Sequence, residues 1–257
     1  MHIVLFALLI LLAVICLFWI LGQYTFWLPH RSWKIPRILM LHQVTADEPA
    51  SGMNMQPEKF EQLLQLLQKK NIKTLTMSEW VEYSKKSSAL KNQKIVALTF
   101  DDGFLDNYTG AFPLLEKYQA KATIFLSPQF AAIEKMQPEQ LAIMSKSGLV
   151  EFGAHTMTHP NLNNISDEQA IQEMCASKKW VEEQIGYCHN FAYPFGRFSP
   201  RHMDMAKEVG FLSAVSTKKR IQPLSLENQY CLPRISISGK MNMLQLRIAL
   251  RVGRYRL

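Results

Sequence analysis

The stretch 94–103, Lys-Ile-Val-Ala-Leu-Thr-Phe-Asp-Asp-Gly, decides the fold class of this 257-residue chain. Residues Ile95–Phe100 are mostly apolar, which is typical of a buried strand, and the Asp-Asp-Gly that follows is typical of a turn. Two adjacent carboxylates repel each other, so each needs a cation or a hydrogen-bond donor to stay ionised. The stretch therefore predicts a buried strand that ends at a charged site.

Similar short runs recur along the chain and alternate with helix-like patterns. We expect further strands at Ile38–Leu41, Lys73–Thr76, Thr123–Leu126, Val150–Ala154, Asn190–Tyr193, Ala214–Ser216 and Ile235–Ile237. Pro57 opens a helical pattern with one apolar face, and Thr76 and Ser166 begin capping boxes of further helices. Strand–helix alternation predicts an α/β protein with a parallel sheet. Seven or eight units favour a closed barrel, with an open doubly wound sheet as the alternative.

The N-terminus carries an apolar segment, Ile3 to Leu21, of 19 residues without a charge. As a helix it is roughly 28 Å long, close to the hydrocarbon thickness of a bilayer. Aromatic residues follow it, and neither a basic n-region nor an Ala-x-Ala site accompanies it, as a cleaved signal peptide would require. We therefore predict a single-pass transmembrane anchor over residues 1–24 and a linker over 25–36, with a signal peptide or a buried helix as alternatives.

The net charge of +8, from 29 Lys+Arg against 21 Asp+Glu, is local rather than general. Residues 1–216 hold 20 basic and 20 acidic side chains, whereas residues 217–257 hold nine basic ones and only Glu227 as an acid. This distribution argues against a nucleic-acid partner, because the excess sits in one short apolar-rich segment. We expect a basic C-terminal helix within 239–257 that lies on an anionic membrane or packs on the body.

Polar side chains of catalytic types follow several predicted strands. His42 follows the first, Asp101 and Asp102 follow Ile95–Phe100, and His155 and His159 follow Val150–Ala154. In a parallel barrel these positions meet at one mouth. Two imidazoles and one carboxylate form a three-ligand metal site with an open coordination position, the arrangement of catalytic rather than structural sites. The second carboxylate is then free to act as a base.

Three motifs carry a family resemblance: Thr99–Gly103, His155–His159 and Tyr193–Gly196. They resemble the motifs of the polysaccharide (NodB-type) deacetylases, carbohydrate esterase family 4, over Arg37 to Ser238. The resemblance implies a distorted (β/α)₇ TIM-like barrel over residues 37–238. It also implies Asp101 as the general base. The implied ligands of a divalent ion, most simply Zn²⁺, are Asp102, His155 and His159.

Two departures from the usual pattern matter. Ala192 stands where the family has an Arg that steadies the base, and no His follows His202 to supply the usual acid. His42 lies in a segment that resembles the poly-N-acetylglucosamine deacetylase branch, so we assign the acid to His42. Arg234, in Leu-Pro-Arg-Ile, resembles that branch's late Arg, and it is our candidate for orienting Asp101, with Arg197 as the competitor.

The resemblance implies a metal-dependent hydrolase that removes the N-acetyl group of a GlcNAc-type sugar in a cell-surface glycan or its precursor. The turn Tyr193, Pro194, Phe195 and Gly196 would contact substrate, with the N–H of Phe195 donating to the oxyanion. A catalytically silent glycan-binding protein of the same fold is the alternative. The side of the membrane stays open, since the resemblance favours the outer face, whereas Arg31, Lys34 and Arg37 after the apolar segment favour the cytoplasm. An N-acetylated polymer and a sugar-lipid both remain possible substrates.

Overall fold

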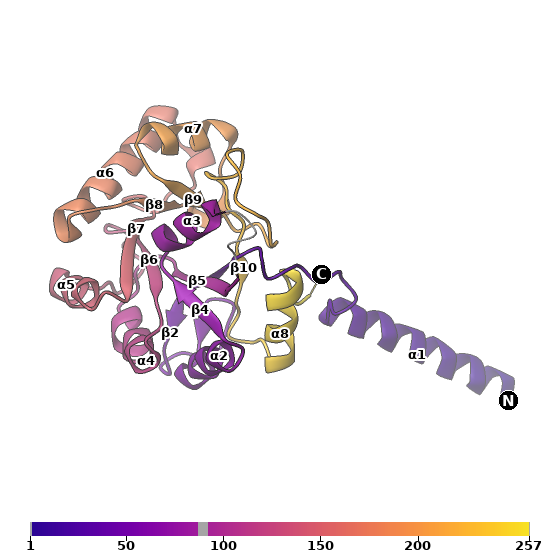
Figure 1. The fold of residues 1–257 in the computed structure, drawn as a ribbon. Helices are drawn as coiled ribbons and strands as arrows, with labels where there is room; N and C mark the ends of the chain where they lie inside the picture. Colours follow the sequence, from indigo (N-terminus) through magenta and orange to yellow (C-terminus); the bar gives the residue numbers. More distant parts are fainter. Residues whose placement is uncertain (1, 87–91, 257) are drawn as a thin grey trace.

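The structure is a computed structural model that describes residues 2–86 and 92–256, and its centre is a curled parallel sheet surrounded by helices (Figure 1). The strands are β1 (Arg37–Leu41), β2 (Gln43–Val44), β3 (Asn54–Met55), β4 (Ile72–Leu75), β5 (Lys94–Phe100), β6 (Ala122–Leu126), β7 (Val150–Ala154), β8 (Asn190–Ala192), β9 (Ser213–Val215) and β10 (Ile235–Ser236). The α-helices are α1 (His2–Gln23), α2 (Pro57–Lys69), α3 (Met77–Lys85), α4 (Phe112–Tyr118), α5 (Pro138–Lys146), α6 (Asp167–Ile185), α7 (Pro200–Glu208) and α8 (Met243–Val252). Shorter helical segments are η2 (Asn107–Ala111), η3 (Leu162–Asn164) and η4 (Pro194–Gly196). Met1 and Leu257, the outer ends of the predicted anchor and C-terminal helix, lie outside the described residues.

The strand order in the main sheet is β10-β1-β5-β6-β7-β8-β9, and β4 pairs with the first half of β5. From β5 to β9 each strand lies beside the next one along the chain, so the order never reverses as it does in a doubly wound sheet. One segment reaches both ends of the sheet. The N–H of Leu232 donates to the carbonyl oxygen of Ala214 in β9 (2.9 Å), and Ile235 begins β10, which pairs with β1. These pairings confirm the α/β class with a curled parallel sheet, and the doubly wound alternative is wrong.

The expected strands are all present, each within about one residue of the predicted bounds. The helix that begins at Pro57 is α2, and both predicted capping boxes form, Thr76 with Glu79 and Ser166 with Gln169. The sequence did not predict the short β2–β3 pair or the π-helical turn η2. The core elements were therefore accessible from apolar periodicity, whereas the small elements beside them were not.

Strand side chains alternate between an outer core under the helices and an inner core inside the sheet. The inner core brings residues of β1, β5, β6, β8 and β9 together with Met77, Trp80 and Val81 of α3. The first turn of α3 lies against the sheet, because Met77 N donates to Thr123 Oγ1 (2.8 Å) and Ser78 N donates to buried Glu151 (3.0 Å). Since Thr123 and Glu151 stand near the beginnings of β6 and β7, α3 covers the end of the sheet where the strands start.

Helix α1 extends away from the body (Figure 1), and its apolar residues Val4–Gln23 are not buried by any described part of the chain. It is long and apolar enough to cross a membrane, a property that it shares with signal sequences. Helix α8 behaves differently. It packs Leu246, Ile248 and Leu250 into the body and leaves Arg247 and Arg251 exposed.

Candidate metal centre

The two-residue period of the strands aims three catalytic-type side chains at the inside of the sheet. On β5 the inward series is Ile95, Ala97 and Thr99, and the next member is Asp101. On β7 the inward residue Glu151 is followed at even spacing by His155, and on β1 the inward residue Ile38 is followed by His42. Each side chain stands directly after its strand ends, so the three meet at the end of the sheet opposite α3.

The remaining residues of the candidate site have left-handed backbone conformations. Asp102 has φ of 76°, His159 has φ of 61° and Phe195 has φ of 57°. Six non-glycine residues in the described chain have positive φ, and these three together with Thr156 are four of them. Such conformations cost roughly 1–3 kcal/mol each for residues other than Gly and persist where the surroundings enforce them, commonly at functional sites. At Asp102 the turn places a second carboxylate beside Asp101.

Asp102, His155 and His159 converge on one point, and their potential ligand atoms lie within 4.8 Å of one another. Oδ1 of Asp102 is 3.4 Å from Nε2 of His155 and 3.2 Å from Nε2 of His159. The donor set of two imidazoles and one carboxylate fits a catalytic zinc site with an open position. Burial raises the pKa of Asp102, but hydrogen bonds from His155 and His159 more than offset this, so its carboxyl titrates well below its usual range.

A second observation supports the fit of these residues to a metal ion. Nδ1 of His155 lies 2.7 Å from Ala192 O, so it carries a hydrogen and donates. Nε2 then donates to Asp102 when the ring is protonated and has a free lone pair for a metal ion when the ring is neutral. Metal-binding histidines commonly have such a carbonyl partner on the other nitrogen. The imidazole of His159 is positioned by contacts with two aromatic rings. It stacks on Phe130 at 4.4 Å between centroids and meets Phe195 edge-on at 4.6 Å.

Asp101 is paired with Arg234, and both side chains are buried. Nη1 and Nη2 of Arg234 donate to Oδ1 and Oδ2 of Asp101 at 2.6 and 2.7 Å, a bidentate pair, and Nε donates to Ser216 O at 3.0 Å. Burial raises the pKa of Asp101, but the guanidinium outweighs it and holds the carboxyl below its usual range. Arg197, the competing candidate, is exposed and makes no ion pair within the described chain.

His42 is half-buried, and it lies close enough to Asp101, Asp102 and Arg234 for their charges to act on it. Burial lowers the pKa of its imidazole, and the two carboxylates partly counteract that effect. The backbone of His42 is fixed, because Asn107 Nδ2 donates to its carbonyl oxygen at 2.7 Å. The candidate acid and the candidate base therefore face the same small space.

The four residues of the turn at 193–196 differ in how close their side chains come to the candidate metal centre. Tyr193 is buried in the outer core, and its hydroxyl donates to Tyr230 O at 2.9 Å, so its side chain does not reach the site. Pro194 is buried as well, and Gly196, with φ of 63°, has Thr217 where a Cβ would stand. Phe195 is 58% exposed beside His159, and its N–H donates to no group in the described part of the chain. Of the four predicted substrate-contacting residues, Phe195 is therefore the one whose side chain contacts the Asp-His-His cluster.

Sequence reasoning missed Glu173, which stands on α6 and supports the loop between the two histidines. One carboxylate oxygen accepts from Met157 N (2.7 Å) and Thr158 N (2.9 Å), and the other accepts from Thr158 Oγ1 (2.7 Å). A lone Glu on an amphipathic helix gives no local signal of such a role. These three bonds hold the loop whose two ends carry His155 and His159.

Replacing Glu173 with Gln is expected to weaken Zn²⁺ binding roughly 10-fold, because supporting contacts of this kind set the orientation of metal ligands. The measurement is a competition titration of the full-length protein against a chromophoric chelator. Glu183→Gln on the same helix is the control, since the Glu183 side chain is 56% exposed and forms an ion pair with Lys179 on the helix surface. Equal Zn²⁺ affinity in Glu173→Gln and Glu183→Gln would contradict the role of Glu173.

The chain resembles known proteins in sequence. The family model described as polysaccharide deacetylase matches residues 89–214. YxkH of Bacillus subtilis, assigned to the polysaccharide deacetylases, is 30% identical over 214 residues, which are 81% of this chain and 73% of YxkH. Poly-β-1,6-N-acetyl-D-glucosamine N-deacetylase of Staphylococcus aureus is 29% identical over 210 residues, 76% of this chain and 71% of that protein.

Solved structures give the same fold. The Streptococcus pyogenes deacetylase PplD, in complex with acetate, superposes with a TM-score of 0.71 at 29% identity over 80% of this chain and 93% of that one. IcaB from Ammonifex degensii superposes with a TM-score of 0.70 at 22% identity over 84% and 96% of the two chains, a likeness of fold alone. The sequence and structural likenesses extend over most of the chain beyond α1, and we conclude that this protein belongs to the polysaccharide deacetylase family.

Proposed function

We propose that this protein is a metal-dependent deacetylase that hydrolyses the N-acetyl group of GlcNAc-type units in a cell-surface glycan or its precursor. One observation carries the proposal: a buried carboxylate fixed by an arginine, Asp101 with Arg234, stands beside an Asp-His-His cluster of metal-ligand type. The Staphylococcus aureus relative, named for poly-β-1,6-N-acetyl-D-glucosamine, supports the substrate class. The distorted (β/α)₇ barrel is part of the proposal, supported by the segment that reaches both β9 and β1.

Asp102, His155 and His159 would hold the divalent ion, and Zn²⁺ suits two nitrogen donors and one oxygen donor. When bound, such an ion polarises an amide carbonyl and lowers the pKa of a water molecule. The chain's own groups handle the protons. Asp101 would accept the proton of the attacking water, and each of its oxygens keeps a lone pair for that purpose while bonded to Arg234.

The other two groups act on the substrate side. The N–H of Phe195 would donate to the oxygen that gains negative charge when water attacks the acetamide carbon. Protonated His42 would give its proton to the departing amine, because an amine leaves poorly as an anion. The exposed ring of Phe195 is available to lie against a sugar.

Acetate release tests the function directly. The full-length protein in detergent, loaded with Zn²⁺, is expected to release acetate from a β-1,6-linked N-acetylglucosamine oligomer. A chelator should abolish release, and added Zn²⁺ should restore it. If the oligomer binds but no acetate appears under any metal condition, the protein is instead the catalytically silent glycan-binding alternative. Activity that survives complete metal removal would contradict the metal dependence.

We further propose that α1 anchors the enzyme in a membrane, so that residues 1–24 form the anchor, 25–36 the linker, 37–238 the catalytic domain and 239–257 the basic C-terminal segment. The support is that the apolar face of α1 is not buried by any described part of the chain. Exposing this much apolar surface to water is unfavourable at about 25 cal/mol per Å². Extraction of the full-length protein from membranes should therefore need detergent rather than high salt.

A further inference from the structure

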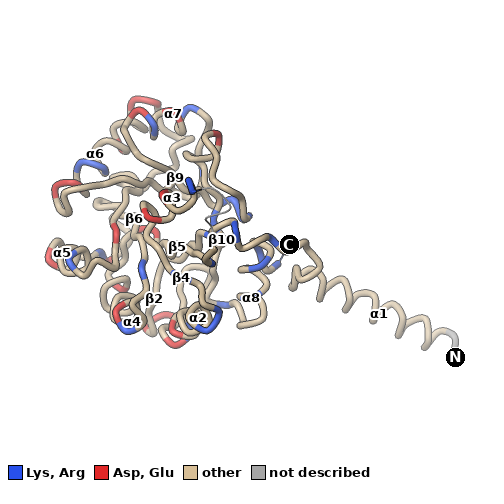
Figure 2. The backbone as a smooth tube through the Cα atoms, in the orientation of Figure 1, with Lys and Arg blue, Asp and Glu red and all other residues tan. Residues whose placement is uncertain are grey.

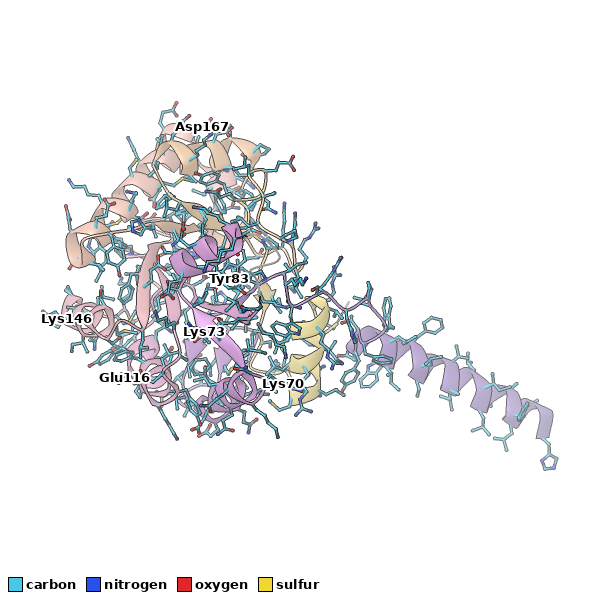
Figure 3. All side chains as sticks on the ribbon, viewed as in Figure 1. Lys70, Lys73, Tyr83, Glu116, Lys146 and Asp167 are labelled. Atoms are coloured by element: carbon cyan, nitrogen blue, oxygen red, sulfur yellow. The ribbon has the colours of Figure 1, made fainter. Side chains whose placement is uncertain are left out.

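A cavity of about 630 Å³ lies far from the candidate metal centre. It is bounded by α8, the end of α2, the beginnings of β4 and β5, and the segment that follows α1. Its lining residues are Phe26, Trp33, Leu66, Lys70, Ile72, Lys94, Leu244, Arg247, Ile248, Leu250 and Arg251. Figure 3 labels Lys70 beside α8. The cavity combines apolar walls with four cationic side chains, so a complementary ligand has both an apolar part and a polar part.

The cations of the cavity have no acidic partners. No Asp or Glu lines it, and α8 itself contains no acid, as its tube shows in Figure 2. Within the described residues, none of Lys70, Lys94, Arg247 and Arg251 forms an ion pair with an acidic side chain. Four like charges around one cavity produce a positive potential that attracts an anion. The complementary ligand is therefore anionic.

The rim of the cavity is apolar and exposed. Phe26 is 54% exposed and Leu244 is 56% exposed, and Trp27 beside them is 48% exposed. Large apolar side chains exposed next to cationic ones are typical of proteins that contact the interface of a bilayer. A free inorganic anion would make no use of this rim, whereas an amphipathic anion would bury it.

Hydrogen bonds fasten the chain just after α1 to the end of α8. Thr25 N donates to Tyr255 O (3.1 Å), Thr25 Oγ1 donates to Arg254 O (2.7 Å) and Arg31 N donates to Arg251 O (2.9 Å). The cavity is therefore held next to the end of α1, and Figure 1 shows α8 beside that end. If α1 crosses a bilayer, as proposed above, the cavity lies at the level of the lipid headgroups.

The cavity is separate from the catalytic site. Lys94 is the first residue of β5, whereas Asp101 follows its last residue, and seven strand residues span roughly 23 Å. A sugar whose acetamide reaches Asp101 cannot occupy the cavity at Lys94 with the same unit. The occupant of the cavity is thus a different molecule from the unit being deacetylated.

We propose that this cavity binds an anionic membrane phospholipid. The phosphate lies among Lys70, Lys94, Arg247 and Arg251, and the acyl chains pass Phe26 and Leu244 toward α1. The bound lipid fixes the body against the bilayer at α8. This inference rests on the membrane location of α1 but not on the deacetylase activity, so the two can fail independently.

The test is lipid binding to the full-length protein in detergent, followed by native mass spectrometry. Phosphatidylglycerol and phosphatidylcholine of equal chain length are the probes. The wild-type protein is expected to prefer phosphatidylglycerol by up to roughly 10³-fold, since four Lys and Arg side chains surround the phosphate and each such residue near a lipid surface contributes about 1 kcal/mol. The double variant Arg247→Gln/Arg251→Gln removes two of the four cations, so its preference is expected to fall roughly 30-fold. Its melting temperature should be unchanged, because both side chains are exposed.

The matched control is Lys146→Gln/Lys207→Gln, which removes the same amount of charge from α5 and α7. Both lysine side chains are exposed, and Lys146 lies on the far side of the body from α8 (Figure 3). It should bind phosphatidylglycerol like the wild type. If the control loses the preference as strongly as the α8 variant, net charge alone explains binding and the cavity is not the site. An unchanged preference in the α8 variant also overturns the proposal. The proposal is also overturned if glycerophosphate competes as well as the whole lipid, because the site would then bind a free phosphate group rather than a lipid.

Discussion

Asp101→Asn is expected to lower the rate of acetate release by about 10²- to 10⁴-fold, the usual contribution of a general base. Asn has the same shape but cannot take a proton from water. Asp101 does not belong to the Asp-His-His cluster, so the variant should bind as much Zn²⁺ as the wild type. Steady-state acetate release, together with metal analysis of the same sample, measures both quantities.

The control for this prediction is Asp102→Asn, which changes the neighbouring carboxylate in the same way. Because Asp102 lies between His155 and His159, this variant should lose Zn²⁺ and activity together. The two variants thus separate a proton acceptor from a metal ligand at adjacent positions. Near-normal turnover by Asp101→Asn, or loss of its metal, would show that the base has been assigned to the wrong residue.

Arg234→Met is expected to lower the free energy of unfolding by about 3–5 kcal/mol, the usual cost of removing one partner of a buried ion pair. The cost arises because Asp101 stays buried with its charge and loses two hydrogen bonds. Activity should fall as well, since nothing then fixes the carboxylate. Thermal denaturation of the full-length protein in detergent, compared with the wild type, gives the change in stability.

The double variant Arg234→Met/Asp101→Asn makes this prediction specific. It has no unpaired buried charge, so it should be more stable than Arg234→Met alone, although equally inactive. Arg197→Met is the surface control and should change the unfolding free energy by less than about 0.5 kcal/mol. If Arg197→Met reduces activity as much as Arg234→Met does, the exposed arginine rather than the buried one orients the base.

The sheet and most of the site were predictable because both depend on short sequence patterns. A buried parallel strand such as Ile95–Phe100 needs an apolar run, and its end fixes where Asp101 stands. The same logic placed His155 after Val150–Ala154 and His42 after β1. Two-residue periodicity then determines which of these side chains point inward.

Other features depend on contacts between distant residues, which local patterns do not contain. Arg234 and Asp101 are 133 positions apart, and nothing in either neighbourhood excludes Arg197 as the partner. The support from Glu173 depends on how α6 packs against the histidine loop. The β2–β3 pair is held by buried Asn54 of β3, whose side chain accepts from Thr45 N (3.2 Å) and donates to Thr45 O (3.2 Å) directly after β2, irregular contacts without a periodic signature.

Helix α3 has a consequence for how substrate reaches the site. Because Met77, Trp80 and Val81 fill the inner core at the start of the strands, the inside of the sheet is closed at that end, and the proposed site is reached from the opposite end. A polymeric substrate of the proposed reaction would therefore not thread through the sheet but would lie across its open end and present one unit at a time. Units in the middle of a chain are then as accessible as its ends. In the proposed reaction, acetate would leave at the same end of the sheet at which water and substrate enter.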